Sequence, residues 1–320
     1  QMFKRLALVV LMIGVAEAIL GLLQYLLGLN AVLAWLRQPL SGWLFQPNLL
    51  AERLGDVAFN WVVFDRASPF GTFINGIDYA IFIAAILGLA LATLIVERGR
   101  ATETFALFVS VLLMGVALLL TFKGSGMIAL AGAAATIALF YMPRPSPRVL
   151  VIGLTGLIVV FLLALPFADL IAQRAAFLLL REQGALGTAG RLDTWASLFD
   201  RFLQRPLFGY GLNHAALLTE PTRTLRAGTI AFNAPTAESA YVGALVETGA
   251  IGFGALMAWF ALVAARAYRR IREDKRLIGI LAALVALWLG NLTVAGFTTD
   301  QNGMLLGLFI GMVLGRWKNP

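Results

Sequence analysis

Four carboxylates lie where a chain that crosses a membrane is expected to avoid charge. Glu17, Asp78 and Glu247 fall within or beside long apolar stretches, and Glu238 opens the stretch that contains Glu247. Such charges are costly in a bilayer and indicate function by default, the alternative being a helix cap or an interhelical hydrogen bond. Desolvation beside apolar surface raises a carboxylate's pKa and suits it to general base catalysis. Glu238 is the first candidate because it ends a long polar segment and Tyr241 follows on its helical face.

Several basic residues stand beside glycine-bearing turns or at the ends of apolar runs. Arg66, Lys123 and Arg191 have this setting, and Arg205 closes the segment that Arg191 begins. Arginine forks match phosphate oxygens in pairs, so these residues are candidates for binding a diphosphate. The alternative for any one of them is a solvated loop charge.

The composition places the chain in a membrane. Of its 320 residues, 60% are hydrophobic and 13% are charged, and the mean hydropathy is +0.85, which together indicate an integral membrane protein. No cysteine and a single histidine, His214, exclude disulfides, thiolate metal sites and His-rich metal sites. His214 is itself more often a structural hydrogen-bonding residue than a catalyst. The "GYG" at 209–211 is a weak signal for a phosphate cradle, and no nucleotide-binding motif accompanies it.

The chain is predicted to be an all-α polytopic membrane protein. Seven apolar runs have about the 20 residues needed to cross a bilayer, and an eighth, the last, is shorter. More than half of the 25 basic residues cluster in the connectors at one face, which the positive-inside rule assigns to the cytoplasm. The net charge of +8 therefore suggests anionic lipid headgroups or lipid-linked phosphates as partners, and no nucleic acid. The eight runs are 3–28, 71–96, 103–122, 126–142, 149–168, 239–265, 277–298 and 303–316.

We expect residues 1–320 to form a single membrane domain with two long outer segments, 29–70 and 169–238. The second is far longer than a connector needs and should be functional. In it, residues 191–206 are predicted to form an amphipathic helix at the membrane surface, stopped by Pro206 and followed by a flexible "FGYGLN" turn. The apolar face of this helix would carry Leu192, Trp195, Phe199, Phe202 and Leu203.

Four stretches in order resemble the superfamily of O-antigen ligases and Wzy-type polysaccharide polymerases. The segment 66–80, "RASPFGTFINGIDYA", is similar to the family's Arg-x-x-Gly-Thr-Phe-x-Asn segment, and 118–132, "LLLTFKGSGMIALAG", occupies the place of its Thr-x-Ser-Arg-Gly turn. The loop 190–213, "GRLDTWASLFDRFLQRPLFGYGLN", matches its Gly-Arg-x-x-x-Trp and Pro-Leu-x-Gly-x-Gly elements. The helix 238–252, "ESAYVGALVETGAIG", matches its Glu-x-Gly-x-x-Gly helix.

The resemblance implies a bacterial inner-membrane glycosyltransferase of the GT-C type, with a large helical periplasmic loop. Members transfer a glycan from undecaprenyl diphosphate to an acceptor hydroxyl at the periplasmic face and need no metal or other cofactor. Their partners are the lipid-linked glycan, a glycan or lipid acceptor and membrane lipids, and could include chain-length regulators or envelope assembly proteins. The family usually has further spans upstream, which agrees with the unnatural start at Gln1.

Two departures bear on the assignment of roles. Glu238 stands where ligases have a catalytic histidine, and Lys123-Gly124 stands where Ser-Arg is usual. A carboxylate at the first position is more familiar in polymerases, which favours a surface polysaccharide polymerase over a ligase attaching glycan to a lipid A-core acceptor. The catalytic residues would then be Glu238 and Arg191. Arg66, Lys123 and Arg205 would bind the diphosphate, and Tyr241, Asp78, His214 and Glu247 would shape the cavity.

Two other classes remain open on the sequence. A transporter or flippase for lipid-linked sugars could use the same cations and carboxylates, although paired hydropathy halves with broken helices are not evident. The third class is a scaffold subunit of an envelope complex. In such a subunit, the departures at 123–124 and 238 would mark the loss of catalytic activity. Turnover by the purified protein separates all three.

Overall fold

The computed structural model describes residues 2–28, 62–63, 66–67, 69–73, 76–96, 101–141, 188–212, 214–218, 223–226, 229–232, 239–294 and 300–315. These residues belong to two compact units. Unit 1 comprises residues within 1–166, 264–290 and 300–320, and unit 2 comprises residues within 167–263 and 291–299.

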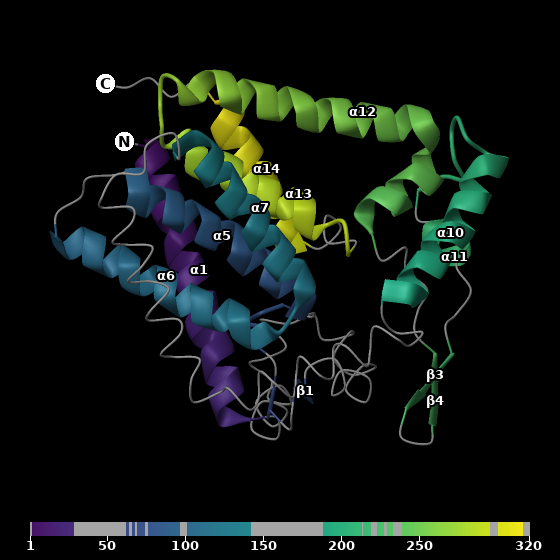
Figure 1. Cartoon of the computed structure of the whole chain (residues 1–320), viewed down its shortest axis with the longest axis horizontal. Coiled ribbons are helices and arrows are strands. Elements are labelled where there is room, and N and C mark those ends of the chain that lie inside the picture. The colour runs from purple at the N-terminus through teal and green to yellow at the C-terminus, as the bar shows by residue number, and fades with distance from the viewer. Residues whose placement is uncertain are drawn as a thin grey trace. The chain divides into compact units, whose positions relative to one another are not determined.

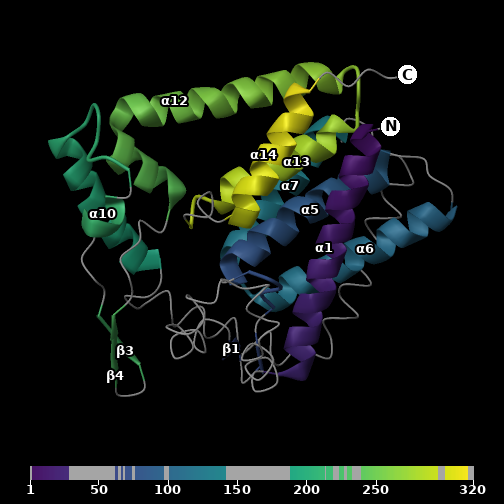
Figure 2. The same ribbon diagram turned by 180° about the vertical axis from the view of Figure 1, so that it is seen from behind.

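Unit 1 is a bundle of apolar helices. Figures 1 and 2 show α5 in its middle, with α1 and α6 on one side and α7, α13 and α14 on the other. Two residues each from β1 (Val62–Val63) and β2 (Arg66–Ala67) pair antiparallel, and β2 contacts α1. The helices are α1 (Met2–Leu27), α5 (Gly76–Val96), α6 (Ala101–Thr121), α7 (Gly124–Tyr141), α13 (Leu277–Gly290), α14 (Asp300–Leu314) and the last turns of α12 (Ala240–Ile271).

Small residues let the helices of unit 1 approach α5 closely. A Cβ on Gly88 of α5 would lie 2.8 Å from the Cβ of Ala133 in α7, and one on Gly279 of α13 would lie 2.9 Å from the side chain of Leu89. Without water to drive association, membrane helices depend on such close packing. The burial of α5 agrees with its central place, since 78% of its most apolar 18-residue stretch is buried.

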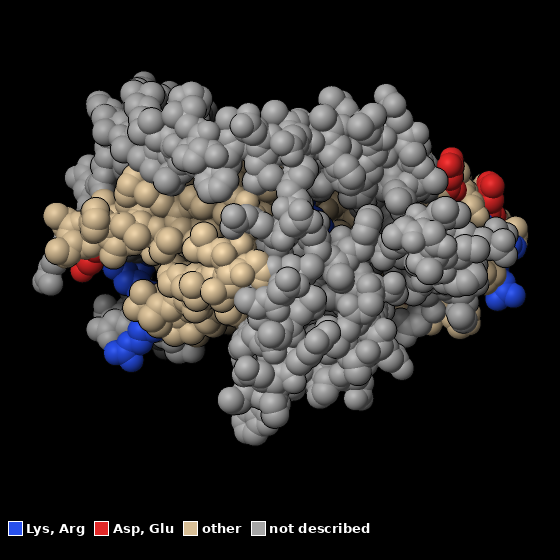
Figure 3. All heavy atoms as spheres, turned by 90° about the horizontal axis from the view of Figure 1, so that it is seen from below, with Lys and Arg blue, Asp and Glu red and all other residues tan. Residues whose placement is uncertain are grey.

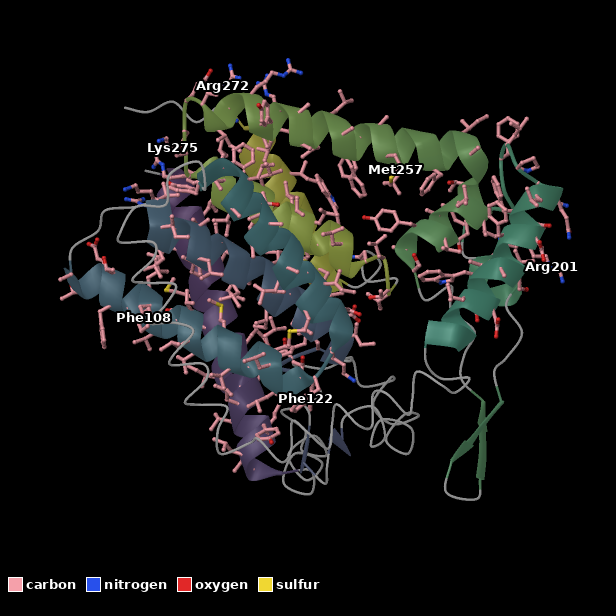
Figure 4. All side chains as sticks on the ribbon, viewed as in Figure 1. Phe108, Phe122, Arg201, Met257, Arg272 and Lys275 are labelled. Carbon is pink, nitrogen blue, oxygen red and sulfur yellow. The ribbon has the colours of Figure 1, made fainter. Side chains whose placement is uncertain are left out.

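Basic residues gather at one end of unit 1. At this end, Arg270 donates to the carbonyls of Val313 and Gly315 at the C-terminus of α14, where a cation is favoured by the helix dipole. The guanidinium of Arg276 lies 5.7 Å from the ring centre of Phe3. Figure 4 shows Arg272 and Lys275 at this end and Phe122, in the α6–α7 turn, toward the opposite end. Seen from below, the surface of the described residues is mostly uncharged (Figure 3).

Unit 2 is built around α10 (Thr188–Gln204), α11 (Ala215–Leu218) and the first part of α12. A hairpin of β3 (Arg223–Arg226) and β4 (Thr229–Phe232) follows α11, with Arg223 opposite Phe232. The sequence analysis did not predict this hairpin. Its two strands are only four residues each, which leaves little periodic signal.

The predicted fold class is confirmed. Among the residues that the structure describes, five helices are long and apolar enough to cross a membrane, and α13 and the part of α14 from Gln301 are shorter apolar helices. The predicted runs 277–298 and 303–316 need correction, because α13 already ends at Gly290 and α14 begins at Asp300. The predicted run 149–168 lies outside the described residues, as do most of 29–70 and parts of 169–238. The single membrane domain and its outer segments stay a prediction.

Helix α10 confirms the helix predicted over 191–206. Leu198 is completely buried, and Trp195 and Phe202 are half-buried beside it. Leu192, Phe199 and Leu203, which we placed on the same apolar face, are exposed. The helix thus packs on the core of unit 2 through Leu198 and Phe202, and three of the five residues of the predicted apolar face stay exposed. The predicted location at the membrane surface stays a prediction.

Candidate functional site

A glycine breaks helix α12 within unit 2. Gly249 has φ 65° and ψ −174°, a combination that is essentially restricted to glycine. A Cβ there would collide with the backbone of Leu207 and Phe208. The break leaves carbonyls before it and N–H groups after it without helical partners, so another segment must supply them.

The loop after α10 supplies those partners. On one side of the break, Tyr210 N–H donates to the carbonyl of Val246 at 3.0 Å, and Gly211 N–H donates to that of Glu247 at 2.8 Å. On the other side, Ala250 N–H donates to the Pro206 carbonyl at 2.8 Å, and Ile251 N–H donates to that of Leu207 at 3.3 Å. The "PLFGYG" loop (206–211) thus fits into the break and restores four hydrogen bonds. We call this arrangement the loop–helix joint.

Glu247 extends the joint to α11. Its Oε1 accepts a hydrogen bond from Ala215 N–H at 3.1 Å. Around this contact, Leu198 of α10, Ala215 and Val246 form a buried cluster, with Phe202 and Tyr210 packed against it. Glu247 therefore connects the first part of α12 to the chain that follows the loop. The cavity-shaping role expected of Glu247 stays a prediction.

Glu247→Ala is expected to lower the free energy of unfolding by about 1–3 kcal/mol, because the part-buried Ala215 N–H loses its acceptor. Glu247→Gln keeps a carbonyl acceptor and should stay close to the wild type. Thermal unfolding of the detergent-purified variants, followed by tryptophan fluorescence, measures both. The matched control is Glu273→Ala, an exposed glutamate outside unit 2. Equal destabilisation by Ala and Gln at 247 would contradict the role given to this hydrogen bond.

Two predicted site residues lie beside the joint. Arg205 is exposed and its guanidinium stands 4.9 Å from the ring centre of Tyr210, whose hydroxyl donates to Gln204 at 3.0 Å. His214 is exposed, and its Nδ1 lies 3.2 Å from the Leu212 carbonyl. The positively charged head of Arg205 remains accessible, while His214 has a local backbone contact that suits a structural role.

The weak signal for a phosphate cradle at 209–211 is not supported by the hydrogen bonds of this turn. Gly209 N–H donates to the Arg205 carbonyl at 3.0 Å, and the N–H groups of Tyr210 and Gly211 are those that fill the break in α12. All three donors are therefore occupied by the protein itself. Residues 209–211 of the predicted flexible turn are thus held by backbone hydrogen bonds.

Helix α12 begins directly after Glu238. Ser239 is buried and acts as the N-cap, with its Oγ accepting from Val242 N–H at 3.4 Å. Ala240 N–H lies within hydrogen-bonding distance of the carbonyls of Asn291 and Val294. Tyr241 is half-buried, and its ring packs edge-on against Phe260, 6.4 Å between centres. Glu238 itself lies outside the described residues, as does the side chain of Arg191, whose backbone is in α10.

Unit 1 holds the other predicted site residues. Asp78, in the first turn of α5, is buried, and its Oδ1 has no hydrogen-bond partner among the residues that the structure describes. The side-chain amide of Asn302 in α14 donates to the backbone carbonyl of Asp78 at 3.2 Å. Lys123 lies half-buried in the two-residue α6–α7 turn, after Phe122 with φ 50°. Arg66 is in β2, where only the backbone is described.

Comparison with known families identifies the region that contains the joint. Residues 109–257 match the family model described as O-antigen ligase (Wzy_C). This part of the chain is similar to the O-antigen ligase family. No curated protein matches the chain.

The O-antigen ligase match confirms the resemblance and contains three of the four motif stretches, 118–132, 190–213 and 238–252, while 66–80 lies outside it. It extends from α6 to Met257 of α12 and so includes the Lys123 turn, Arg191, the loop–helix joint and position 238. Within it, the Pro-Leu-x-Gly-x-Gly and Glu-x-Gly elements meet at the joint, which gives a structural reason for their glycines. The match supports a ligase-type or polymerase-type, glycosyltransferase-like function in a multi-pass membrane protein.

Proposed function

We propose that the protein transfers a glycan from undecaprenyl diphosphate to an acceptor hydroxyl at the periplasmic face of the bacterial inner membrane. The observation that carries the proposal is the O-antigen ligase match over 109–257, with its loop and helix motifs joined in one structural element. Within that class we favour a surface polysaccharide polymerase. The reason is Glu238, a carboxylate at the position where the ligases have a histidine.

The proposed reaction is a displacement at the anomeric carbon of the donor sugar. The acceptor hydroxyl attacks this carbon, its proton passes to the Glu238 carboxylate, and the bond to the diphosphate oxygen breaks. Arg191 stabilises the negative charge that develops on the departing diphosphate. Arg66, Lys123 and Arg205 bind the diphosphate, and Tyr241, Asp78, His214 and Glu247 shape the cavity. The proposed transfer is metal-independent, which turnover in the presence of a chelator tests.

Arg191→Ala is expected to weaken binding of the diphosphate carrier by about tenfold or more, because one charge-assisted contact to phosphate is lost. Binding of undecaprenyl diphosphate to the purified protein in nanodiscs measures this directly. Arg201→Ala is the matched control, since Arg201 is an exposed arginine of the same helix. Equal affinity of the wild type and Arg191→Ala would assign Arg191 to structure.

The proposed sidedness predicts a labelling pattern. The chain has no cysteine, so one introduced thiol is unique. Asp200→Cys, at an exposed position of α10, should react with a membrane-impermeant maleimide in intact spheroplasts. Glu273→Cys, exposed between α12 and α13, should react only after lysis. The reverse pattern would invert the topology and move the active site to the cytoplasm.

A ligase is the second candidate, because the matching family is described as O-antigen ligase. Glycan profiles of cells that lack the protein separate the two activities. Loss of long chains, with single repeat units still attached to the lipid acceptor, would indicate a polymerase. Full-length chains accumulating on undecaprenyl diphosphate would indicate a ligase.

A further inference from the structure

A carboxylate of α1 holds the turn that precedes α5. Glu17 lies well inside the apolar helix, yet both its oxygens are used by Thr72, 55 residues further along the chain. The Oε2 accepts from Thr72 N–H at 2.9 Å, and the Oε1 accepts from the Thr72 hydroxyl at 2.6 Å. Hydrogen bonds to a charged acceptor are among the stronger ones in proteins. Glu17 therefore binds Thr72 specifically, and this contact attaches the turn to α1.

Gln24 holds the same turn at a second place. It follows Glu17 by seven residues, about two helical turns, so both side chains leave the same face of α1. Its Oε1 accepts from the N–H groups of Phe70 and Gly71 at 3.1 and 2.9 Å, and its Nε2 donates to the Gly71 carbonyl at 2.8 Å. Gln24 is buried. The two side chains thus make five hydrogen bonds to residues 70–72.

Steric contacts with Glu17 and Tyr79 also restrict the conformation of the turn. Gly71 has φ +56°, and a Cβ there would collide with the Glu17 carboxylate and the ring of Tyr79. The Tyr79 hydroxyl donates to the backbone carbonyl of Glu17 at 3.2 Å. The ring of Phe73 packs edge-on against Tyr79, 5.9 Å between centres. One conformation of residues 70–73 therefore fits between α1 and α5.

The packing of α1 against α5 does not by itself require polar side chains in α1 or an irregular backbone at residues 70–72. Two polar side chains inside an apolar helix are costly unless they are fully bonded. An irregular backbone at membrane depth likewise needs partners for its N–H and C=O groups. Here the polar side chains of Glu17 and Gln24 and the backbone of residues 70–72 bond to one another. These bonds lie at the end of the segment that begins with Arg66. Only three residues separate Arg66 from Phe70, and Pro69 among them has a restricted φ.

We infer that Glu17 and Gln24 are positioning residues that set the place of Arg66 for the diphosphate of the lipid-linked donor. The inference rests on the proposed function. It adds two residues of α1 that lie outside the family match. Because β2, which carries Arg66, also contacts α1, the segment is attached to this helix on both sides of Pro69.

A double-mutant cycle tests the inference. Arg66→Ala should raise the KM for the donor and lower kcat/KM by about tenfold to hundredfold. Glu17→Ala should reproduce this loss, and the double variant should lose little more, because Glu17 acts through Arg66. Glu17→Gln should retain most of the wild-type activity, since its amide can accept from Thr72 N–H and donate to the Thr72 hydroxyl. Losses of kcat/KM that multiply in the double variant would overturn the inference.

A second pair of variants separates positioning from general destabilisation. Thr72→Val removes the hydroxyl that Glu17 binds, and Thr93→Val removes one that bonds only within α5, to the Leu89 carbonyl. Thr72→Val should raise the KM for the donor, whereas Thr93→Val should not. Gly71→Ala and Gly115→Ala form a similar pair, because the Cβ would be blocked at 71 and free of contacts at 115. Equal KM values within each pair would also overturn the inference.

Failure of the inference is distinguishable from failure of the proposed function. If the wild type transfers glycan and Glu17→Ala has the wild-type KM, the positioning role is wrong and the transferase remains. If the folded wild type does not transfer glycan at all, the proposed function is wrong and the positioning role falls with it.

Discussion

Glu238→Gln is expected to lower kcat for glycan transfer by about 10²–10⁴-fold, the usual contribution of a general base. The amide is nearly the same size as the carboxylate but cannot take the proton of the acceptor hydroxyl. Glu238 directly precedes Ser239, the buried N-cap of α12, so the residue that follows the base has a fixed place in unit 2. We therefore expect the KM for the donor and the thermal stability to change little.

The measurement for Glu238 is single-turnover transfer by purified protein, with thermal unfolding of the same preparation. Glu273→Gln is the matched control, since it makes the same chemical change at an exposed position between α12 and α13. Full activity of folded Glu238→Gln would remove Glu238 as the base. A loss of activity with an equal loss of folded protein would assign Glu238 to structure.

Gly249→Ala is expected to reduce the free energy of unfolding by about 3 kcal/mol or more, from backbone strain and a steric clash together. The added Cβ meets the backbone of Leu207 and Phe208, and glycine alone adopts the observed φ and ψ readily. Relief of the clash would push the "PLFGYG" loop out of the break. The four backbone hydrogen bonds of the loop–helix joint would then lose their partners.

Thermal unfolding in detergent measures the effect of Gly249→Ala, and the matched control is Gly254→Ala. Gly254 lies in the same helix, and a Cβ there would meet nothing within 4 Å. The control should be as stable as the wild type or more so, because alanine favours the helix. Similar unfolding temperatures for the two variants would contradict the fit of the loop into the break.

Hydropathy predicted the helical class and most of the spans, because a bilayer imposes a length and an apolar composition on each helix. It could not find the end of α13 at Gly290, since Leu292, Val294 and Phe297 continue an apolar pattern after it. Nor could it find the break at Gly249, because glycine is common in membrane helices and only the approach of the 206–211 loop reveals its role.

The candidate site was predicted in part. The family motifs led to the loop and helix that meet at the joint, and periodicity led to α10. The glycine pattern at 209–211 was a weak signal for a phosphate cradle, but it does not determine which acceptors the backbone N–H groups bind. In the structure these acceptors are carbonyls of the protein. The contacts of Glu17 and Gln24 with residues 70–72 were missed, since they join positions that are far apart in sequence. A polar residue recurring after seven positions in an apolar helix is the signal that could have found them.

We propose above all that this protein transfers glycan from a lipid diphosphate. The most direct measurement supplies purified wild-type protein in nanodiscs with undecaprenyl diphosphate-linked glycan and a glycan acceptor, and follows both products. We predict a lengthened acceptor and release of one undecaprenyl diphosphate for each transfer, both lost in Glu238→Gln. Folded wild-type protein that binds the donor but leaves it intact would contradict the claim and favour a transporter or scaffold.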